Sequence, residues 1–144
     1  NEIIKSFKET SKKNFIINFD QYSSSLNISK SIEIVYGLRN FIGNANKFSK
    51  SKVFINLKSD SDVTEIIIED DGEGYSNDVL RKIGEPYIKS YKSSIKSKSG
   101  LGLGIFIGKT LLEKNYASIL CRNSKTRGGA EVNIKWKNKN LFNI

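Results

Sequence analysis

Three glycines set two residues apart, Gly100, Gly102 and Gly104, could place backbone N–H groups around an anion. Leu101 and Leu103 stand between them, and a segment typical of a helix follows at once. Glycine has no side chain to hold a phosphate away from the backbone, and a helix N-terminus adds about half a positive charge. The spacing matches neither the P-loop nor the G-x-G-x-x-G fingerprint. Such a turn is more often a plain connector, so its chemistry depends on what the rest of the chain supplies.

A polar stripe on the helix predicted over residues 31–48 is the second candidate. Asn40, Asn44 and Lys47 are spaced by four and three residues, so at about 100° per residue they share one face of that helix. A carboxamide oxygen suits Mg²⁺, and an ammonium attracts phosphate oxygens. The alternative is an ordinary polar helix face.

The third candidate is Asp70, which follows an apolar segment typical of a strand and precedes Gly72 and Gly74. An aspartate at a strand end can accept a hydrogen bond from an exocyclic amine, and nearby glycines let a flat ring approach the backbone. The segment could also be a calcium-type loop, but the spaced carboxylates and final glutamate of an EF-hand are missing. A plain turn is the other alternative.

Apolar periodicity predicts the elements that position these residues. The pattern favours helices on one face of a mixed, mostly antiparallel sheet, that is, a two-layer α+β sandwich. We expect a single domain over residues 1–144, with a loop at about 84–100. Strands are predicted at 15–19, 53–57, 63–69, 117–122 and 130–136, and helices at 2–13, 31–48, 77–83 and from the glycines to about 115.

Composition excludes several classes of function. The chain has 144 residues, 38% of them hydrophobic, which fits a soluble globular domain without a signal peptide or a membrane span. Its net charge of +9 comes mostly from scattered lysines without interleaved aromatic residues, so we expect a solvated surface and no nucleic-acid binding. The absence of histidine excludes a histidine relay or histidine metal site within the chain. The lone cysteine, Cys121, indicates a reducing, cytoplasmic setting and a packed core thiol.

Three motifs stand in fixed order: Asn-x-x-x-Asn on a helix, Asp-x-Gly-x-Gly after a strand, and Gly-x-Gly-x-Gly before a helix. Over essentially residues 1–137, this order resembles the catalytic, ATP-binding domain of bacterial sensor histidine kinases. Those kinases share their nucleotide-binding sandwich with gyrase-type, mismatch-repair and heat-shock chaperone ATPases. The spellings of residues 84–87, 104–113 and 128–132 are most similar to RegB-type redox-responsive kinases.

This resemblance implies a role for each candidate residue. Asp70 would bind the amino group of adenine, and Asn44 would hold Mg²⁺. Asn40 and Lys47 would face the phosphates as the catalytic residues. The remaining implied ATP-binding residues are Phe48, Gly72, Gly74, Tyr87, Gly100, Leu101, Gly102, Leu103 and Gly104.

The resemblance also implies a lid, and it has departures. Residues 84–99 would cover the nucleotide, and they hold four candidate cations for its phosphates. Lys98 stands where glycine is frequent, Tyr87 where phenylalanine is usual, and Ala130 where a threonine or serine often helps to read adenine. The candidate lid cations are Lys89, Lys92, Lys96 and Lys98.

The function implied by the resemblance is transfer of the γ-phosphoryl group of ATP, with Mg²⁺, to a histidine on a separate dimerisation domain. A response regulator would act downstream, and any membrane anchor would lie in an upstream segment. The main alternative is an ATP-hydrolysing clamp of the gyrase, mismatch-repair or chaperone type. A third hypothesis is a serine kinase of the anti-sigma type. The clamp enzymes carry a glutamate base where this chain has Asn40, and the serine kinases also tend to carry it, so Asn40 counts against both. A basic nucleic-acid module is a fourth hypothesis, against which all three motifs stand.

Overall fold

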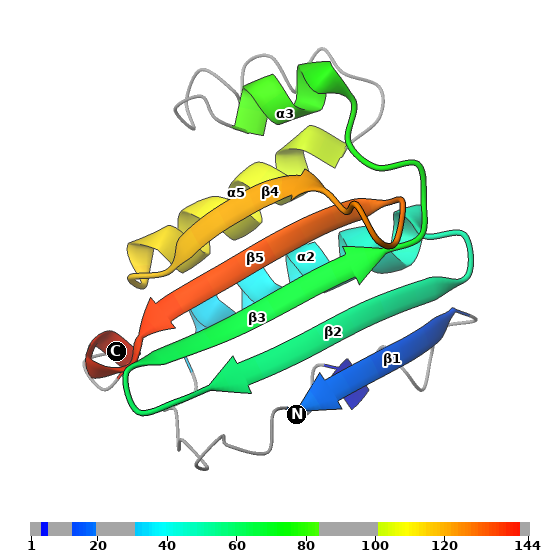
Figure 1. The fold of residues 1–144 in the computed structure, drawn as a ribbon. Coiled ribbons are helices and arrows are strands. Elements are labelled where there is room, and N and C mark those ends of the chain that lie inside the picture. The colour runs from blue at the N-terminus through cyan, green and yellow to red at the C-terminus, as the bar shows by residue number, and fades with distance from the viewer. Residues whose placement is uncertain (1–3, 6–12, 20–30, 84–100, 142–144) are drawn as a thin grey trace.

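A five-stranded sheet with the order β1-β2-β3-β5-β4 forms one layer of the molecule (Figure 1). The computed structural model describes residues 4–5, 13–19, 31–83 and 101–141. β1 pairs with β2 in parallel, and the other pairings are antiparallel, which confirms the predicted mixed, mostly antiparallel sheet. The strands are β1 (Asn14–Phe19), β2 (Lys52–Ser59), β3 (Val63–Asp70), β4 (Ser118–Asn123) and β5 (Ala130–Lys137).

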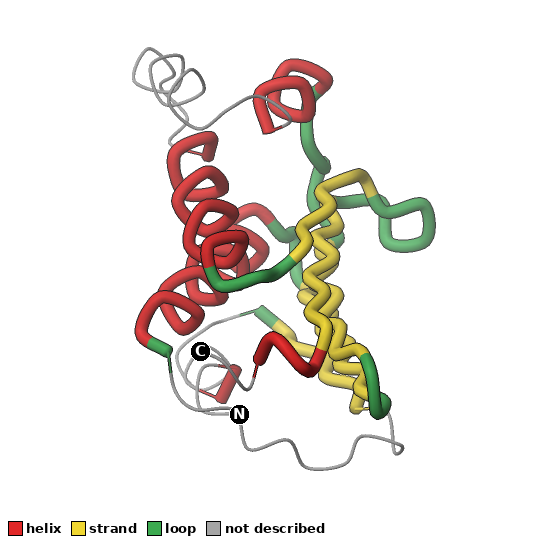
Figure 2. Tube along the Cα trace, turned by 90° about the vertical axis from the view of Figure 1, so that its left-hand side faces the viewer, coloured by secondary structure: helices red, strands yellow, loops and turns green. Residues whose placement is uncertain are grey.

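Two long helices, α2 (Ile32–Phe48) and α5 (Leu101–Lys114), form the second layer on one face of the sheet (Figure 2). The core lies between the layers and includes the fully buried side chains of Phe41, Ile68 and Ile134. The predicted α+β sandwich is therefore confirmed. The predicted helix α3 (Asn77–Ile83) follows β3, and an unpredicted short helix, α6 (Asn138–Leu141), follows β5.

Helix α2 begins with a capping serine and buries the face that the periodicity predicts. The Ser31 hydroxyl accepts a hydrogen bond from the backbone N–H of Ile34 at 3.4 Å. The sequence spaces five apolar residues along one face of this helix, and the first four of them are buried: Ile34, Leu38, Phe41, Ala45 and Phe48. Phe48, at the C-terminal end of that face, is 38% exposed. It is the last residue of α2 and lines a cavity at the edge of the core.

Helix α5 begins one residue after Gly100, so Gly102 and Gly104 lie within its first turn. The prediction that they precede the helix was wrong. Backbone N–H groups near these glycines are still available to an anion, because the first four N–H groups of a helix have no acceptor within it. Gly100 itself lies outside the described residues.

Other predictions also fall outside the described residues: most of the helix over 2–13, and the lid with Tyr87 and its lysines. Within the described part of the chain, no helix is long and apolar enough to cross a membrane.

Candidate functional site

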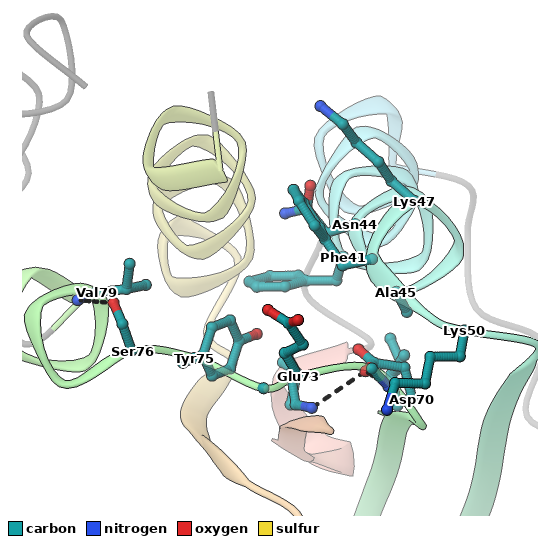
Figure 3. Close-up of a pocket in the computed structure, with 16 residues that line it drawn as sticks. Phe41, Asn44, Ala45, Lys47, Lys50, Asp70, Glu73, Tyr75, Ser76 and Val79 are labelled. Atoms are coloured by element: carbon teal, nitrogen blue, oxygen red, sulfur yellow. Dashed lines mark hydrogen bonds between the residues drawn. The ribbon is translucent and has the colours of Figure 1, made fainter. Parts of the chain in front are cut away.

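A cavity of about 530 Å³ opens between the C-terminal half of α2, the end of β3 and the segment that follows β3 (Figure 3). Ligand sites commonly enclose about 300–1,000 Å³. Apolar side chains and glycine backbone form most of the wall. It is lined by Phe41, Asn44, Ala45, Lys47, Phe48, Lys50, Ile68, Asp70, Gly72, Glu73, Gly74, Tyr75, Ser76, Val79, Ala130 and Val132.

Asp70, the last residue of β3, brings a buried carboxylate to this cavity. Its Oδ1 accepts hydrogen bonds from the backbone N–H groups of Gly72 at 2.9 Å and Ala130 at 3.3 Å. No group of the described residues donates to Oδ2, which leaves an acceptor for a ligand that carries an N–H donor. Burial raises the pKa of Asp70 in spite of its two hydrogen bonds.

The adjacent Asp71 fixes the loop between α2 and β2. Its carboxylate accepts hydrogen bonds from the backbone N–H groups of Lys50 at 2.8 Å, Ser51 at 3.1 Å and Lys52 at 3.1 Å. Burial alone would raise its pKa, but these bonds and one from the Ser51 hydroxyl lower the pKa of Asp71 to about 2. Because Phe48 and Lys50 line the cavity, Asp71 positions the α2 side of the site.

Glycines allow the backbone to close around Asp70. A Cβ atom on Gly72 would lie 2.1 Å from the carbonyl oxygen of Phe48, and one on Gly129 would lie 2.1 Å from Oδ1 of Asp70. Gly74 has a φ of +80°, in the left-handed region that strains other residues. The sequence resemblance included Gly129, within residues 128–132, without showing that Gly129 contacts Asp70.

Asn44 points from α2 into the cavity (Figure 3). Its Nδ2 is buried without a hydrogen-bond partner in the described part of the structure, and such a donor costs about 1–3 kcal/mol. A phosphate oxygen would satisfy it, while the amide oxygen suits a Mg²⁺ ion shared with phosphates. The described residues contain no group of three or more His, Cys, Asp or Glu side chains that could hold a metal by themselves.

The other two residues of the predicted polar stripe have different positions. Lys47 lines the cavity, with its Nζ 5.2 Å from the centre of the Phe48 ring. Asn40 does not line it; its Nδ2 donates to the backbone carbonyl of Tyr36 at 2.8 Å. The structure thus brings Asn44 and Lys47 to the cavity and leaves Asn40 beside it.

The first turn of α5 lies at the polar end of this site. Lys114 near the end of α5 pairs with Glu33 near the start of α2, with 3.1 Å between Nζ and Oε2, so the two helices run antiparallel. The N-terminus of α5 therefore lies beside the end of α2 that carries Asn44 and Lys47 (Figure 3). Its free N–H groups and the helix dipole favour an anion there.

Sequence reasoning missed several residues of the wall. Tyr75 is buried, and its hydroxyl interacts with the thiol of Cys121. Burial raises the pKa of both groups, that of Cys121 to about 12, which fits the predicted packed thiol. Tyr75 could have been identified from the sequence, because it directly follows Gly74 of the predicted Asp-x-Gly-x-Gly motif. The lining residues that the sequence did not predict for the site are Phe41, Ala45, Lys50, Ile68, Glu73, Tyr75, Ser76, Val79 and Val132.

This arrangement suits a ligand with a flat apolar ring, an N–H donor at one end and anionic oxygens at the other. A buried acceptor lies at one end of an apolar cavity, and a free amide donor, an ammonium and a helix N-terminus lie at the other. Together with the mixed sheet and its antiparallel helices, the site defines a nucleotide-binding domain.

Comparison with known proteins identifies the family. Residues 29–140 match the family described as histidine kinase-, DNA gyrase B-, and HSP90-like ATPase, and the chain belongs to it. The chain is 37% identical over 120 residues to the sensor histidine kinase RegB of Cereibacter sphaeroides, and 26% identical over 91 residues to the sensor histidine kinase CpxA of Escherichia coli. These matches cover 72% and 63% of this chain but 26% and 20% of the two relatives. The chain therefore spans about a quarter or less of their length.

Solved structures share the fold. The catalytic domain of the histidine kinase ThkA matches with a TM-score of 0.72 at 19% identity, covering 95% of this chain and 92% of that one. The mycobacterial sensor histidine kinase MprB matches with a TM-score of 0.68 at 20% identity, covering 94% and 92%. The predicted family and the likeness to RegB-type kinases are confirmed. The relatives favour the catalytic domain of a two-component kinase over the ATP-hydrolysing clamp.

Proposed function

We propose that this chain binds ATP with Mg²⁺ and donates the γ-phosphoryl group to a histidine on another domain. The observation that carries the proposal is the buried carboxylate of Asp70, whose Oδ2 is left without a donor beside an apolar cavity. Adenine offers an exocyclic amine to such an acceptor. Guanine has a carbonyl oxygen at the corresponding place, which the carboxylate would repel. The site should therefore prefer ATP to GTP.

At the other end of the cavity, Asn44 and Lys47 would hold the phosphates. The buried Nδ2 of Asn44 would donate to a phosphate oxygen, and its amide oxygen would ligate Mg²⁺. Mg²⁺, when bound, would neutralise charge on the phosphates. Lys47 and the N–H groups at the start of α5 would add fixed positive potential. Phosphoryl transfer needs mainly such positioning and electrostatic stabilisation from the protein.

The nucleophile would come from outside these residues, because the sequence contains no histidine. We place it on a dimerisation domain that pairs with this catalytic domain of residues 1–144. A response regulator would then receive the phosphoryl group in the cytoplasm.

The hydrolytic alternative needs a base that activates water. Asn40 occupies the place of that base, and its amide is engaged with the Tyr36 carbonyl at 2.8 Å. A carboxamide cannot accept a proton from water as a carboxylate does. This observation favours transfer over hydrolysis.

Calorimetry with non-hydrolysable ATP and GTP analogues, each with Mg²⁺, tests the proposal. We expect the ATP analogue to bind at least about tenfold more tightly, as a site built around one ligand hydrogen bond should discriminate. Equal affinity for both analogues, or no binding, would contradict the proposed function.

A further inference from the structure

We infer that Asn123 is a positioning residue for the nucleotide cavity, an inference that rests on the proposed function. Asn123 ends β4 and does not itself line the cavity. Its side chain bonds the backbone of the segment that follows β3. Its Oδ1 accepts from the backbone N–H of Tyr75 at 2.6 Å, and its Nδ2 donates to the carbonyl of the same residue at 3.0 Å.

The chemistry of this contact requires a carboxamide. An asparagine side chain presents a donor and an acceptor side by side, as a peptide group does, so it pairs with both backbone groups of one residue. An aspartate of the same shape would still accept from the Tyr75 N–H. Its second oxygen would face the Tyr75 carbonyl oxygen and repel it.

The segment held by Asn123 forms part of the cavity wall. Glu73, Gly74 and Tyr75 all line the cavity. Among the described residues, no other hydrogen bond reaches the backbone of these three. A Cβ atom on Gly74 would lie 2.7 Å from Oδ1 of Asn123, so the two groups are in close contact. Without Asn123, this wall would lose its hydrogen bonds and sample more conformations.

Asn123 also lies next to the support of Asp70. In the β4–β5 pairing its register partner is Ala130. The backbone N–H of Ala130 donates to Oδ1 of Asp70 at 3.3 Å. Asn123 therefore links the Glu73–Tyr75 segment, which follows Asp70, to β5, whose first residue donates a hydrogen bond to Asp70. We expect the loss of Asn123 to weaken binding of the adenine base.

The test compares Asn123→Asp with Asn133→Asp in the same protein. Asn133 lies half-buried on β5, and its side chain makes no hydrogen bond among the described residues, so it controls for charge and shape. Hydrogen exchange followed by NMR would report the Tyr75 N–H, and calorimetry would report affinity for a non-hydrolysable ATP analogue. Asn123→Asp should lose protection at Tyr75 and bind the analogue about tenfold more weakly, while amides of β3 and β5 stay protected. Affinity for Mg²⁺-tripolyphosphate, which lacks the base, should not change. Asn133→Asp should match the wild type.

The outcomes separate this inference from the function beneath it. If the wild type binds the analogue and Asn123→Asp binds equally well, the role of Asn123 is wrong and the proposed function stands. Equal weakening for the analogue and for tripolyphosphate would assign Asn123 a general structural role and overturn the inference. Absence of wild-type binding would overturn the proposed function together with it. If Asn123→Asp does not fold, Asn123→Ala removes both hydrogen bonds without adding charge and is judged by the same measurements.

Discussion

Asp70 uses one carboxylate oxygen for the fold and leaves the other for a ligand. Its Oδ1 receives the N–H groups of Gly72 and Ala130, which join the segment after β3 to the start of β5. An asparagine could keep these two hydrogen bonds through its amide oxygen. It would lose the charge that strengthens a hydrogen bond from a ligand amine.

We expect Asp70→Asn to bind the ATP analogue at least about tenfold more weakly, because hydrogen bonds to charged groups contribute about 1.5–3 kcal/mol. Calorimetry measures the change. Asp62→Asn is the matched control, since Asp62 is exposed at the opposite end of β3 and its carboxylate bonds no described residue. Unchanged affinity in Asp70→Asn would remove this residue from the base site.

The raised pKa of Asp70 predicts a pH dependence with a definite sign. Burial favours its neutral form, so protonation begins at a higher pH than the ordinary aspartate value of 3.8. Affinity for ATP should therefore fall as the pH is lowered toward that raised pKa, and Asp70→Asn should lack this change. Because the pKa of Asp70 is higher in the folded protein than its ordinary value of 3.8, ionisation of Asp70 lowers the stability of the fold as the pH rises above 3.8. At pH 7, the urea concentration that unfolds Asp70→Asn should accordingly equal or exceed the concentration that unfolds the wild type.

Asn44 leads to a separate prediction about stability and binding. Its buried, unpartnered Nδ2 makes the ligand-free fold less stable. Asn44→Ala should therefore destabilise the free protein by no more than about 1 kcal/mol, the cost of the space that the removed side-chain atoms leave. The same substitution should weaken ATP binding more in Mg²⁺ than in EDTA, because it would remove the proposed metal ligand as well as the proposed phosphate donor. Thermal unfolding and calorimetry measure the two effects. Equal loss of affinity in both buffers would argue against the metal role.

At the scale of elements, the apolar periodicity of the sequence predicted most of the fold, because an element that buries one face must repeat its apolar residues on that face. Helix α2 and the five strands each lie against a single core, so their apolar spacing is visible in the sequence. The sequence predicted that α5 starts after its glycines, because glycine is a poor helix former. In the structure the helix starts earlier, at Leu101, because tertiary packing overrides that local preference. The contacts of Gly129 with Asp70 and of Asn123 with Tyr75 join residues far apart in the chain. No local pattern shows such contacts.

The close contact between α2 and α5 predicts whether a Gly→Ala substitution in α5 raises or lowers the stability of the protein. A Cβ atom on Gly108 would lie 2.9 Å from the ring of Phe41, which is buried and lines the cavity. In an open helix, Gly→Ala stabilises by about 0.5–1 kcal/mol. Here Gly108→Ala should destabilise by about 1–3 kcal/mol through overpacking and weaken ATP binding by displacing Phe41.

Urea unfolding tests this, with Thr110→Ala as control, because Thr110 is an exposed residue of the same helix. The control should leave stability unchanged or slightly raised. A stabilised Gly108→Ala would show that the helices have room to separate.

For the whole molecule, catalytic competence should depend on a second domain. The proposed site would supply groups for adenine, the phosphates and Mg²⁺, but the sequence contains no imidazole to attack the γ-phosphate. The chain also matches only 26% of RegB, so most of the length of that relative lies outside the match. Binding and phosphoryl transfer can therefore be measured apart.

We predict that these 144 residues bind ATP, do not label themselves with radioactive γ-phosphate and hydrolyse ATP barely above background. Asn40 cannot act as the base for water, and charge neutralisation by Mg²⁺, Lys47 and the α5 amides does not replace a nucleophile. A separately added histidine-bearing dimerisation domain of the same kinase should become labelled, slowly, because the effective concentration that a covalent tether provides is absent. The label should be lost in acid and kept in alkali, as a phosphorus–nitrogen bond requires. Asp70→Asn should slow this transfer and Asp62→Asn should not. Rapid ATP turnover by the chain alone would support the clamp-type ATPase and contradict the kinase assignment.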